Sequence, residues 1–169
     1  MKDTLTSTLA TPYRNAILLG GMTAATLDLA YACIRQAGRG RSIEWTMQSV
    51  ATGWLGKGAF EGGWMSALLG VVSHYSILLV AAWLFIATSQ RVLSVKQHLL
   101  AAGAVFGVLV FLFMNFVVLP ASAFPYDLKY PPAVLLEGFF SHAVLVGIPI
   151  AFAARWAQRS STTPPPAHG

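Results

Sequence analysis

Six polar side chains interrupt otherwise apolar stretches of this sequence, and their chemistry calls for an explanation. They are Asp28, His74, Asn115, Glu137, Ser141 and His142. Carboxylates and imidazoles can exchange protons near neutral pH, bind metal ions or pair with one another. An ionisable group that faces lipid is costly, so such groups should face the protein interior or water. We therefore predict that these six residues form one buried polar cluster.

Helical spacing supports this prediction, because the polar residues share helix faces with small residues. Asp28 lies on a stripe of glycine and alanine, while His74 follows Gly70, and His142 follows Gly138, by four positions. Residues four apart lie on the same side of a helix. Small residues let helix backbones approach closely in lipid. The polar groups are thus expected at helix–helix contacts.

Three interpretations of the cluster remain open. It could be a structural hydrogen-bond network of a non-catalytic assembly or scaffold subunit, in which carboxylates pair with histidines and hold helices in register. It could be a path or sensor for protons or small ions. It could also be a haem or divalent-metal site, whose candidate ligands are His74, His142, Asp28 and Glu137. No CxxCH or HExxH motif accompanies these residues, so no cofactor is predicted.

A hydrolytic enzyme is the least favoured interpretation. The sequence contains two adjacent serine–histidine pairs, Ser73-His74 and Ser141-His142. Neighbouring residues on a helix point about 100° apart, so the histidine cannot act as the base for the serine beside it. We predict no catalytic residues and a protein that is not an enzyme.

The composition identifies the kind of protein that must hold the cluster. Of the 169 residues, 10% are charged and 56% belong to the apolar set, and the mean hydropathy is +0.62. Soluble domains carry about 25% charged residues. These values exclude a disordered chain, a collagen-like fibre and an ordinary soluble enzyme. They predict an integral membrane protein.

Charged residues divide the chain into four apolar stretches. Residues 62–90 and 97–126 contain no Asp, Glu, Lys or Arg, while residues 15–34 contain only Asp28 and residues 130–154 only Glu137. About 20 apolar residues suffice for a helix to cross the hydrocarbon core. We predict an all-α, four-helix membrane bundle within a single domain, residues 1–159, whose spans are near 16–34, 65–87, 98–119 and 133–155.

A further helix is predicted between the first two spans, near residues 43–55. Ile43, Met47, Val50 and Trp54 recur at helical spacing and form one apolar face, from which Gln48 is excluded. Such an amphipathic helix is expected to lie at the membrane interface. At the other end of the chain, the Ser/Thr/Pro-rich residues 160–169 are expected to be disordered.

The net charge of +5 is assigned to lipid contacts rather than to nucleic acid. The basic residues flank the predicted spans, where they anchor helix ends and meet anionic lipid. With four spans both termini lie on the same side, which the distribution of basic residues places in the cytoplasm. One bundle encloses little room for a pore, so conduction would need a homo-oligomer or a crevice open to one side.

Residues 66–159 carry three features of one family. These are the segment Gly70-Val71-Val72-Ser73-His74, a Gly/Ala-rich third span that ends at Pro120, and Glu137 and His142 followed by Arg155 and Arg159. In these features the chain resembles the YagU-like family of small four-span bacterial inner-membrane proteins. The resemblance implies the bacterial inner (cytoplasmic) membrane and no established catalytic residues. The loop between the first two spans does not match the family.

Overall fold

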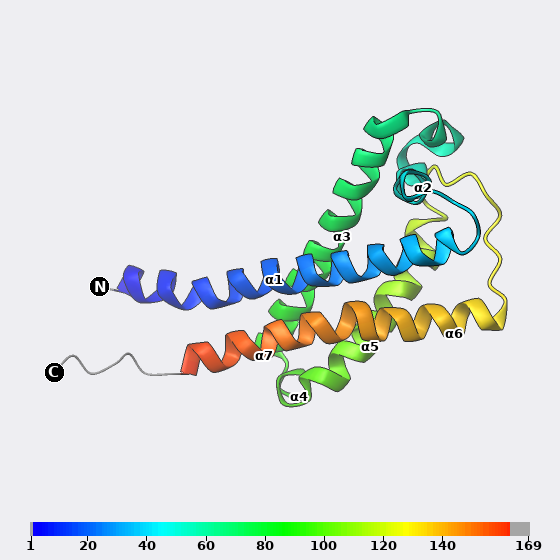
Figure 1. The fold of residues 1–169 in the computed structure, drawn as a ribbon. Coiled ribbons are helices and arrows are strands. Elements are labelled where there is room, and N and C mark those ends of the chain that lie inside the picture. Colours follow the sequence, from blue (N-terminus) through cyan, green and yellow to red (C-terminus); the bar gives the residue numbers. More distant parts are fainter. Residues whose placement is uncertain (1, 163–169) are drawn as a thin grey trace.

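The computed structural model describes residues 2–162, and side chains from Thr11 to Ser161. All regular structure in this part of the chain is helical (Figure 1). The helices are α1 (Lys2–Ala37), α2 (Ile43–Leu55), η1 (Gly56–Phe60), α3 (Gly63–Arg91), α4 (Leu93–Gln97), α5 (Leu99–Phe113), η2 (Met114–Val118), α6 (Pro132–Ser141), η3 (His142–Gly147) and α7 (Ile148–Thr162).

Four helical segments are long and apolar enough to cross a membrane, which confirms the prediction of four spans. They are Thr11–Ala37, Gly63–Arg91, Leu99–Val118 and Pro132–Ser161. Three of them are longer than predicted, because the helices continue into their polar flanks. Helix α7 in particular extends to Thr162, past Ser160, where we predicted the tail to begin. Residues 163–169 of that tail lie outside the described residues.

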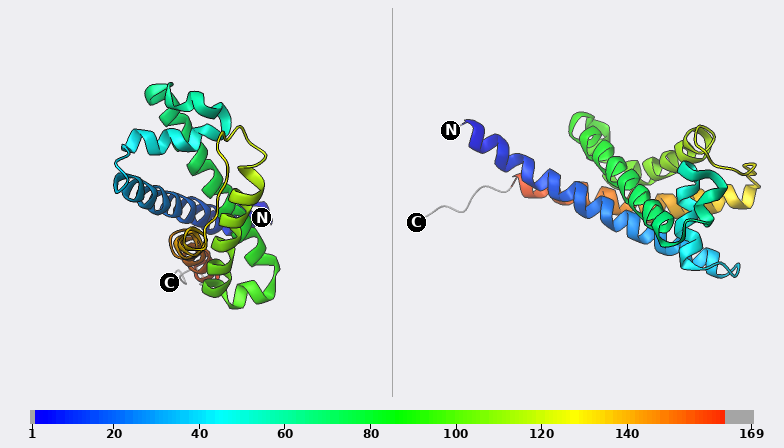
Figure 2. Two further views of the ribbon diagram at one scale, coloured as in Figure 1. Left: turned by 90° about the vertical axis from the view of Figure 1, so that its right-hand side faces the viewer. Right: turned by 90° about the horizontal axis from the view of Figure 1, so that it is seen from above.

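Helix α1 is the central element of the fold. It runs side by side with α6 and α7 in the opposite direction, and it contacts α3 on a second face (Figures 1 and 2). Two consecutive glycines permit both contacts. A Cβ on Gly20 would lie 2.9 Å from the Ala153 Cβ, and a Cβ on Gly21 would lie 3.0 Å from the Leu79 Cα. Small residues thus fit α1 between two neighbours.

Helix α5 packs against the segment that joins α6 to α7, and glycines again form the contact. A Cβ on Gly103 would lie 2.7 Å from the Gly147 carbonyl oxygen, and a Cβ on Gly147 would lie 2.0 Å from that of Gly103. The contact is therefore made by two backbones. The GxxxG spacing of Gly103 and Gly107 serves packing within the chain.

Two short π-helical segments, η2 and η3, widen the third and fourth spans. The second of them directly precedes Pro149, which lies in the first turn of α7. Proline has no N–H to donate to the preceding turn, and π-bulges are one way in which a helix accommodates such a gap. The widened turn therefore lies on the N-terminal side of Pro149.

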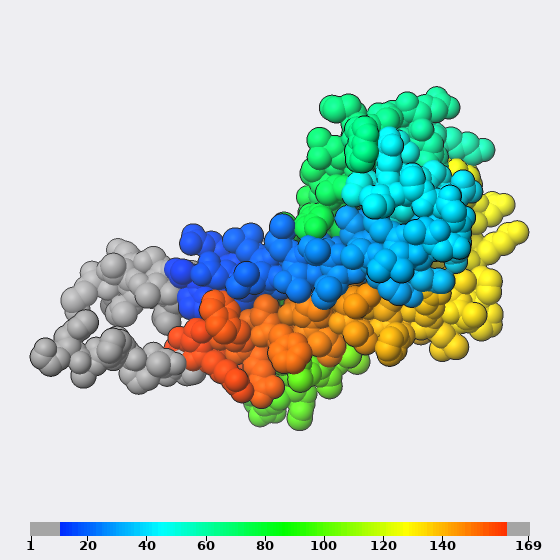
Figure 3. Space-filling model, in the orientation of Figure 1, coloured from blue at the N-terminus to red at the C-terminus, as the bar shows by residue number. Residues whose placement is uncertain are grey.

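Helix α2 crosses α3 with its polar side inward. A Cβ on Gly70 would lie 1.9 Å from the Met47 carbonyl oxygen, and the buried residues of α2 include Gln48. The side chains of Ile43 and Trp54 are 58% and 68% exposed. In Figure 3, α2 and the first turns of α3 project from the long layer formed by α1 and α7. On the apolar face of α2, Ile43 and Trp54 are therefore exposed, whereas Met47 and Val50 are half-buried.

Candidate functional site

A crevice of about 240 Å³ lies between the C-terminal half of α1 and the α6–η3 segment. Phe111 and Val134 are apolar, and eight of the twelve lining residues have polar or charged side chains. From α1 come Asp28, Tyr31, Ala32, Arg35 and Gln36, and the turn after α1 contributes Arg39; from α6 and η3 come Glu137, Gly138, Ser141 and His142. Four of the six predicted cluster residues therefore line one crevice.

His74 joins these residues from α3. Its Nε2 lies 3.9 Å from Oδ2 of Asp28, and the two side chains are only 12% and 16% exposed. The same nitrogen lies 3.0 Å from the Ala25 carbonyl oxygen. Because a carbonyl only accepts hydrogen bonds, Nε2 must carry a proton and donate it to Ala25. This leaves Nδ1 of His74 as the nitrogen that gains a proton when the ring becomes charged.

His142 adopts the opposite tautomer. Its Nδ1 lies 3.1 Å from the Gly138 carbonyl oxygen and therefore donates to it, so Nε2 is the open position. The ring packs edge-on against Phe111, with a centroid separation of 5.0 Å. His142 also interacts electrostatically with both Asp28 and His74. Two imidazoles with one free nitrogen each thus lie around one carboxylate.

Glu137 lies nearer to the end of α1 and is held by two groups. It forms an ion pair with Arg35, and it accepts a hydrogen bond of 2.5 Å from the Tyr31 hydroxyl. Both members of the ion pair are partly exposed, at 41% for Arg35 and 33% for Glu137. This pair fixes α6 against α1, and Arg39 lies in the turn that follows α1.

The structure does not bring Asn115 to the cluster. Its side-chain amide donates a hydrogen bond of 2.9 Å to the Phe111 carbonyl one turn earlier. The backbone carbonyl of Asn115 accepts a hydrogen bond of 2.7 Å from the Tyr130 hydroxyl. Burial raises the pKa of Tyr130 above the ordinary tyrosine value of 10.0, so the hydroxyl remains a donor at neutral pH. Asn115 secures the widened η2 turn and the loop that follows it.

The serine hydroxyls beside the two histidines are engaged locally. Ser73 donates to the Leu69 carbonyl at 2.7 Å and accepts a hydrogen bond from Nε1 of Trp54 at 3.0 Å. Ser141 is buried; its hydroxyl lies 3.2 Å from the Gly138 carbonyl and 3.3 Å from Nδ1 of His142. That nitrogen already carries a proton, so it cannot accept one from Ser141 in this tautomer. Neither pair is arranged as nucleophile and base.

The candidate metal ligands do not form a coordination sphere. Glu137 is occupied by Arg35 and Tyr31, and His74 donates to a backbone carbonyl. Within residues 2–162, no three His, Cys, Asp or Glu side chains are grouped in a way that could hold a metal ion. Each histidine donates through one ring nitrogen to a backbone carbonyl, so its other nitrogen is the one that can gain or lose a proton.

Sequence reasoning missed Tyr31, Arg35 and Arg39 as members of the site. They follow Asp28 by three, seven and eleven positions, which places Tyr31 and Arg35 on the same face of α1 as Asp28, while Arg39 lies in the turn after that helix. The sequence therefore contains a spacing from which these residues could have been predicted. The charges at positions 35 and 39 were instead assigned to the membrane surface because they mark the end of an apolar stretch.

The comparisons with known proteins give this site no precedent. No protein-family model matches the sequence, no curated protein matches it, and no solved structure matches the fold. The interpretation of the crevice therefore depends on its own residues.

Proposed function

We propose that the chain is an integral membrane protein that takes up and releases a proton at Asp28, His74 and His142. In this proposal the four long helices cross the bilayer, in a bacterial inner membrane as the YagU-like resemblance implies. Both termini are cytoplasmic, and α2 lies at the opposite interface with its exposed apolar face toward lipid. Large apolar side chains exposed along the spans, such as Leu109 and Phe140, support contact with lipid.

The observation that carries the proposal is the Asp28–His74 pair. Two mostly buried titratable groups lie 3.9 Å apart, at a point where the apolar spans of α1 and α3 cross. A histidine with an open nitrogen beside a carboxylate can become charged near neutral pH. A group of this kind inside a membrane domain is by default a functional candidate.

The crevice supplies a route for protons from one side. It extends from Arg39, at the end of α1, past the Arg35–Glu137 pair to Asp28 and His142. A crevice that opens to one side suits sensing of the pH in that compartment. Relay of protons or small ions across the membrane would need a second opening, or an axis between copies of the chain in a homo-oligomer.

The proposal is tested by following the histidines directly. Protein labelled with ¹⁵N-histidine is placed in nanodiscs and its imidazole resonances are recorded between pH 5 and 9. His74→Gln and His142→Gln assign the two rings. We expect both rings to titrate, and Asp28→Asn to move the titration midpoint of both because the carboxylate is their shared neighbour.

His98 provides a matched control, because it lies at the turn between α4 and α5. Its replacement by glutamine should leave the other two titrations unchanged. If both rings keep a single tautomer over the whole range, the cluster is a structural hydrogen-bond network and the proposal fails. If they titrate, proton flux into liposomes loaded with a pH-sensitive dye distinguishes a relay from a sensor.

A further inference from the structure

Helices α3 and α5 leave an apolar groove between them. They lie close together near α4 and diverge toward α2 (Figures 1 and 2). Two adjoining cavities, of about 390 Å³ and 580 Å³, occupy the space between the helices and share Ile77, Met114 and Val118 as lining residues. Along α3 the groove extends from Leu84 to Ser73, which is about 16 Å at a rise of about 1.5 Å per residue.

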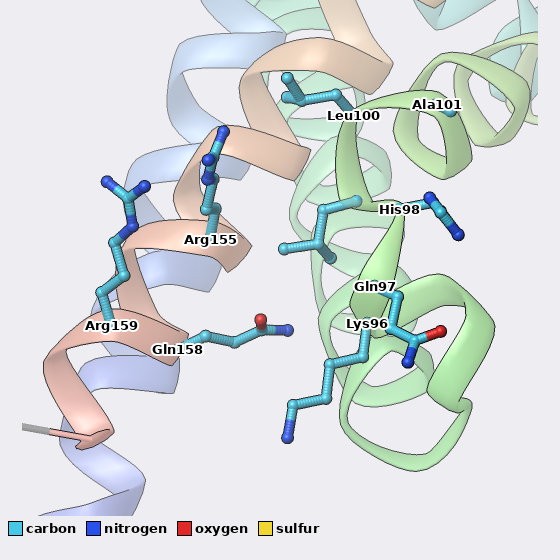
Figure 4. A pocket seen from close by; sticks show the side chains of 9 residues that line it. Lys96, Gln97, His98, Leu100, Ala101, Arg155, Gln158 and Arg159 are labelled. Carbon is cyan, nitrogen blue, oxygen red and sulfur yellow. The ribbon is translucent and has the colours of Figure 1, made fainter.

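An aromatic contact closes the groove at the α4 end. The rings of Phe85, on α3, and Phe106, on α5, lie with their centroids 5.2 Å apart. Leu84 and Phe106 are the lining residues at this level. Beyond this pair the chain turns from α4 into α5, and its side chains there include the polar Lys96 and Gln97 (Figure 4). The apolar lining therefore ends at the phenylalanine pair.

Helix α2 and the segment after η2 close the other end. Nε1 of Trp54 donates a hydrogen bond of 3.0 Å to Oγ of Ser73, and the N–H of Ala123 donates one of 2.9 Å to the Gly53 carbonyl. These bonds attach α2 to α3 on one side and to the segment after η2 on the other. A membrane-spanning helix of another protein is about 10–12 Å across and cannot continue past this bridge. A narrow chain can enter the groove along its open side.

The chemistry of the groove suits an uncharged hydrocarbon chain. No charged side chain is among its lining residues, and its two serine hydroxyls are engaged within the protein. Ser73 donates to the Leu69 carbonyl. Ser122 donates to the Leu119 carbonyl at 2.7 Å and accepts a hydrogen bond of 3.2 Å from the Phe124 N–H. These hydroxyls are therefore not available to select a polar headgroup.

The depth of the groove matches one leaflet of a bilayer. Its α5 wall begins at Phe106, near the middle of the candidate span Leu99–Val118, and reaches the last residue of that span. The hydrocarbon core of a bilayer is about 30 Å thick, so the acyl chains of one leaflet extend about 15 Å. The chains of the leaflet on the α2 side therefore cover the length of the groove.

Packing favours a chain that stays in the groove. The lining includes the exposed Val80 and Leu109, one on each wall, and the buried Ala81. Lipid chains are as apolar as these side chains, so the hydrophobic effect does not drive the contact. An empty groove, however, would lose the dispersion contacts of the side chains that line it. We propose that one acyl chain of a bilayer phospholipid lies lengthwise in this groove, packed between α3 and α5.

Native mass spectrometry in detergent tests the proposal, because it counts bound lipids and copies of the chain together. Delipidated protein is incubated with palmitoyl-oleoyl phosphatidylcholine or with phosphatidylglycerol that carries the same chains. We expect one groove-bound lipid per chain with either headgroup, because the groove contacts only the acyl chain. Dihexanoyl phosphatidylcholine, whose chains are too short to fill the groove, should not be retained.

The double variant Val80→Trp/Leu109→Trp fills the groove from both walls, and it should lose the retained lipid with either headgroup. Val72→Trp/Val105→Trp is the matched control. Val72 is 55% exposed on α3, as Val80 is, and Val105 on α5 is 60% exposed against 54% for Leu109, but neither control residue lines the groove. This control should retain lipid as the parent does. Thermal unfolding before lipid is added checks that both double variants are folded.

A photochemical measurement on the parent protein needs no substitution. Phosphatidylcholine with a diazirine in the middle of one acyl chain is bound and photolysed, and the crosslinked residues are mapped. We expect crosslinks at Ile77 and Met114, where the two cavities join. Crosslinks spread evenly over the exposed apolar surface would overturn the proposal, as would full lipid retention by Val80→Trp/Leu109→Trp. If that variant instead reduces the number of copies in the complex, the groove holds a second copy of the chain and the proposal is wrong.

Discussion

The carbonyl oxygen of His142 lies 2.1 Å from the point that a Cβ on Gly107 would occupy. Real Cβ atoms are never so close to a carbonyl oxygen, so only glycine permits this contact between α5 and η3. The same contact fixes the depth at which the His142 ring enters the cluster. The packing of α5 against η3 therefore determines where the His142 ring lies in the candidate proton site.

Replacing Gly107 with alanine should destabilise the protein by about 1–3 kcal/mol, the usual cost of overpacking a well-packed contact. The free energy of unfolding is measured by SDS titration in mixed micelles. Gly58→Ala is the matched control, because no atom lies within 4 Å of a Cβ at that position. Equal stability of the two variants would mean that α5 does not press on the backbone of η3.

The Arg35–Glu137 ion pair should contribute little by itself. Both residues are partly exposed, and such pairs are worth about 0.2–1 kcal/mol. A double-mutant cycle with Arg35→Gln and Glu137→Gln measures their coupling. Tyr31→Phe should lower the free energy of unfolding by about 1 kcal/mol relative to the parent, because it removes the hydrogen bond to Glu137. A coupling well above this range would indicate that the pair is shielded from water, contrary to its exposure.

The buried side of α2 is polar. We therefore expect an apolar substitution on that side to destabilise the protein, in contrast to an ordinary amphipathic helix. Gln48 is buried, and its side-chain amide donates a hydrogen bond of 3.1 Å to the Gly63 carbonyl. Gln48→Leu should therefore destabilise the protein by about 1 kcal/mol, because it removes this hydrogen bond and leaves the Gly63 carbonyl with Ser66 Oγ as a side-chain donor. Ile43→Ser, at an exposed apolar position, should change the free energy of unfolding in detergent by less than about 0.5 kcal/mol. If the serine variant were the less stable, the apolar face of α2 would have to pack inward.

The Tyr130 hydroxyl should make stability depend on pH in the alkaline range. Its pKa is raised in the folded state, so the folded protein holds this proton more tightly than the unfolded chain. The resulting stabilisation is fully present below the unfolded value near 10 and is lost as the pH rises through the folded value. We expect unfolding midpoints to fall above about pH 10 in the parent. Tyr130→Phe should lack the part of this fall that comes from Tyr130, and at neutral pH it should be about 1 kcal/mol less stable.

The sequence allowed the four apolar helical spans to be predicted, because a charged residue inside hydrocarbon is costly and so marks the span ends. The structure places four of the six polar residues around one crevice. Helical periodicity predicts the face of a helix on which a residue lies, as it did for Asp28 on the small-residue side of α1. It does not define the depth at which one helix passes another.

The features that could not be predicted from the sequence depend on the depth at which one helix meets another. Asn115 has a polar side chain in an apolar span, as His142 does, yet it bonds within its own helix. Arg35 was assigned to the membrane surface, although α6 places Glu137 at its height. The periodicity of α2 predicts an apolar face, but periodicity does not state whether that face meets protein or lipid. These features depend on contacts between segments that are distant along the chain.

The close fit of Gly20 against Ala153 has a consequence for biosynthesis. The first span meets its longest neighbour only after the last span has been made. At about 5–20 residues per second, Ala153 leaves the ribosome on the order of 10 s after Gly20. For most of that interval Asp28 lacks the segment that carries Glu137 and His142. The polar crevice is therefore completed only when the chain is nearly finished.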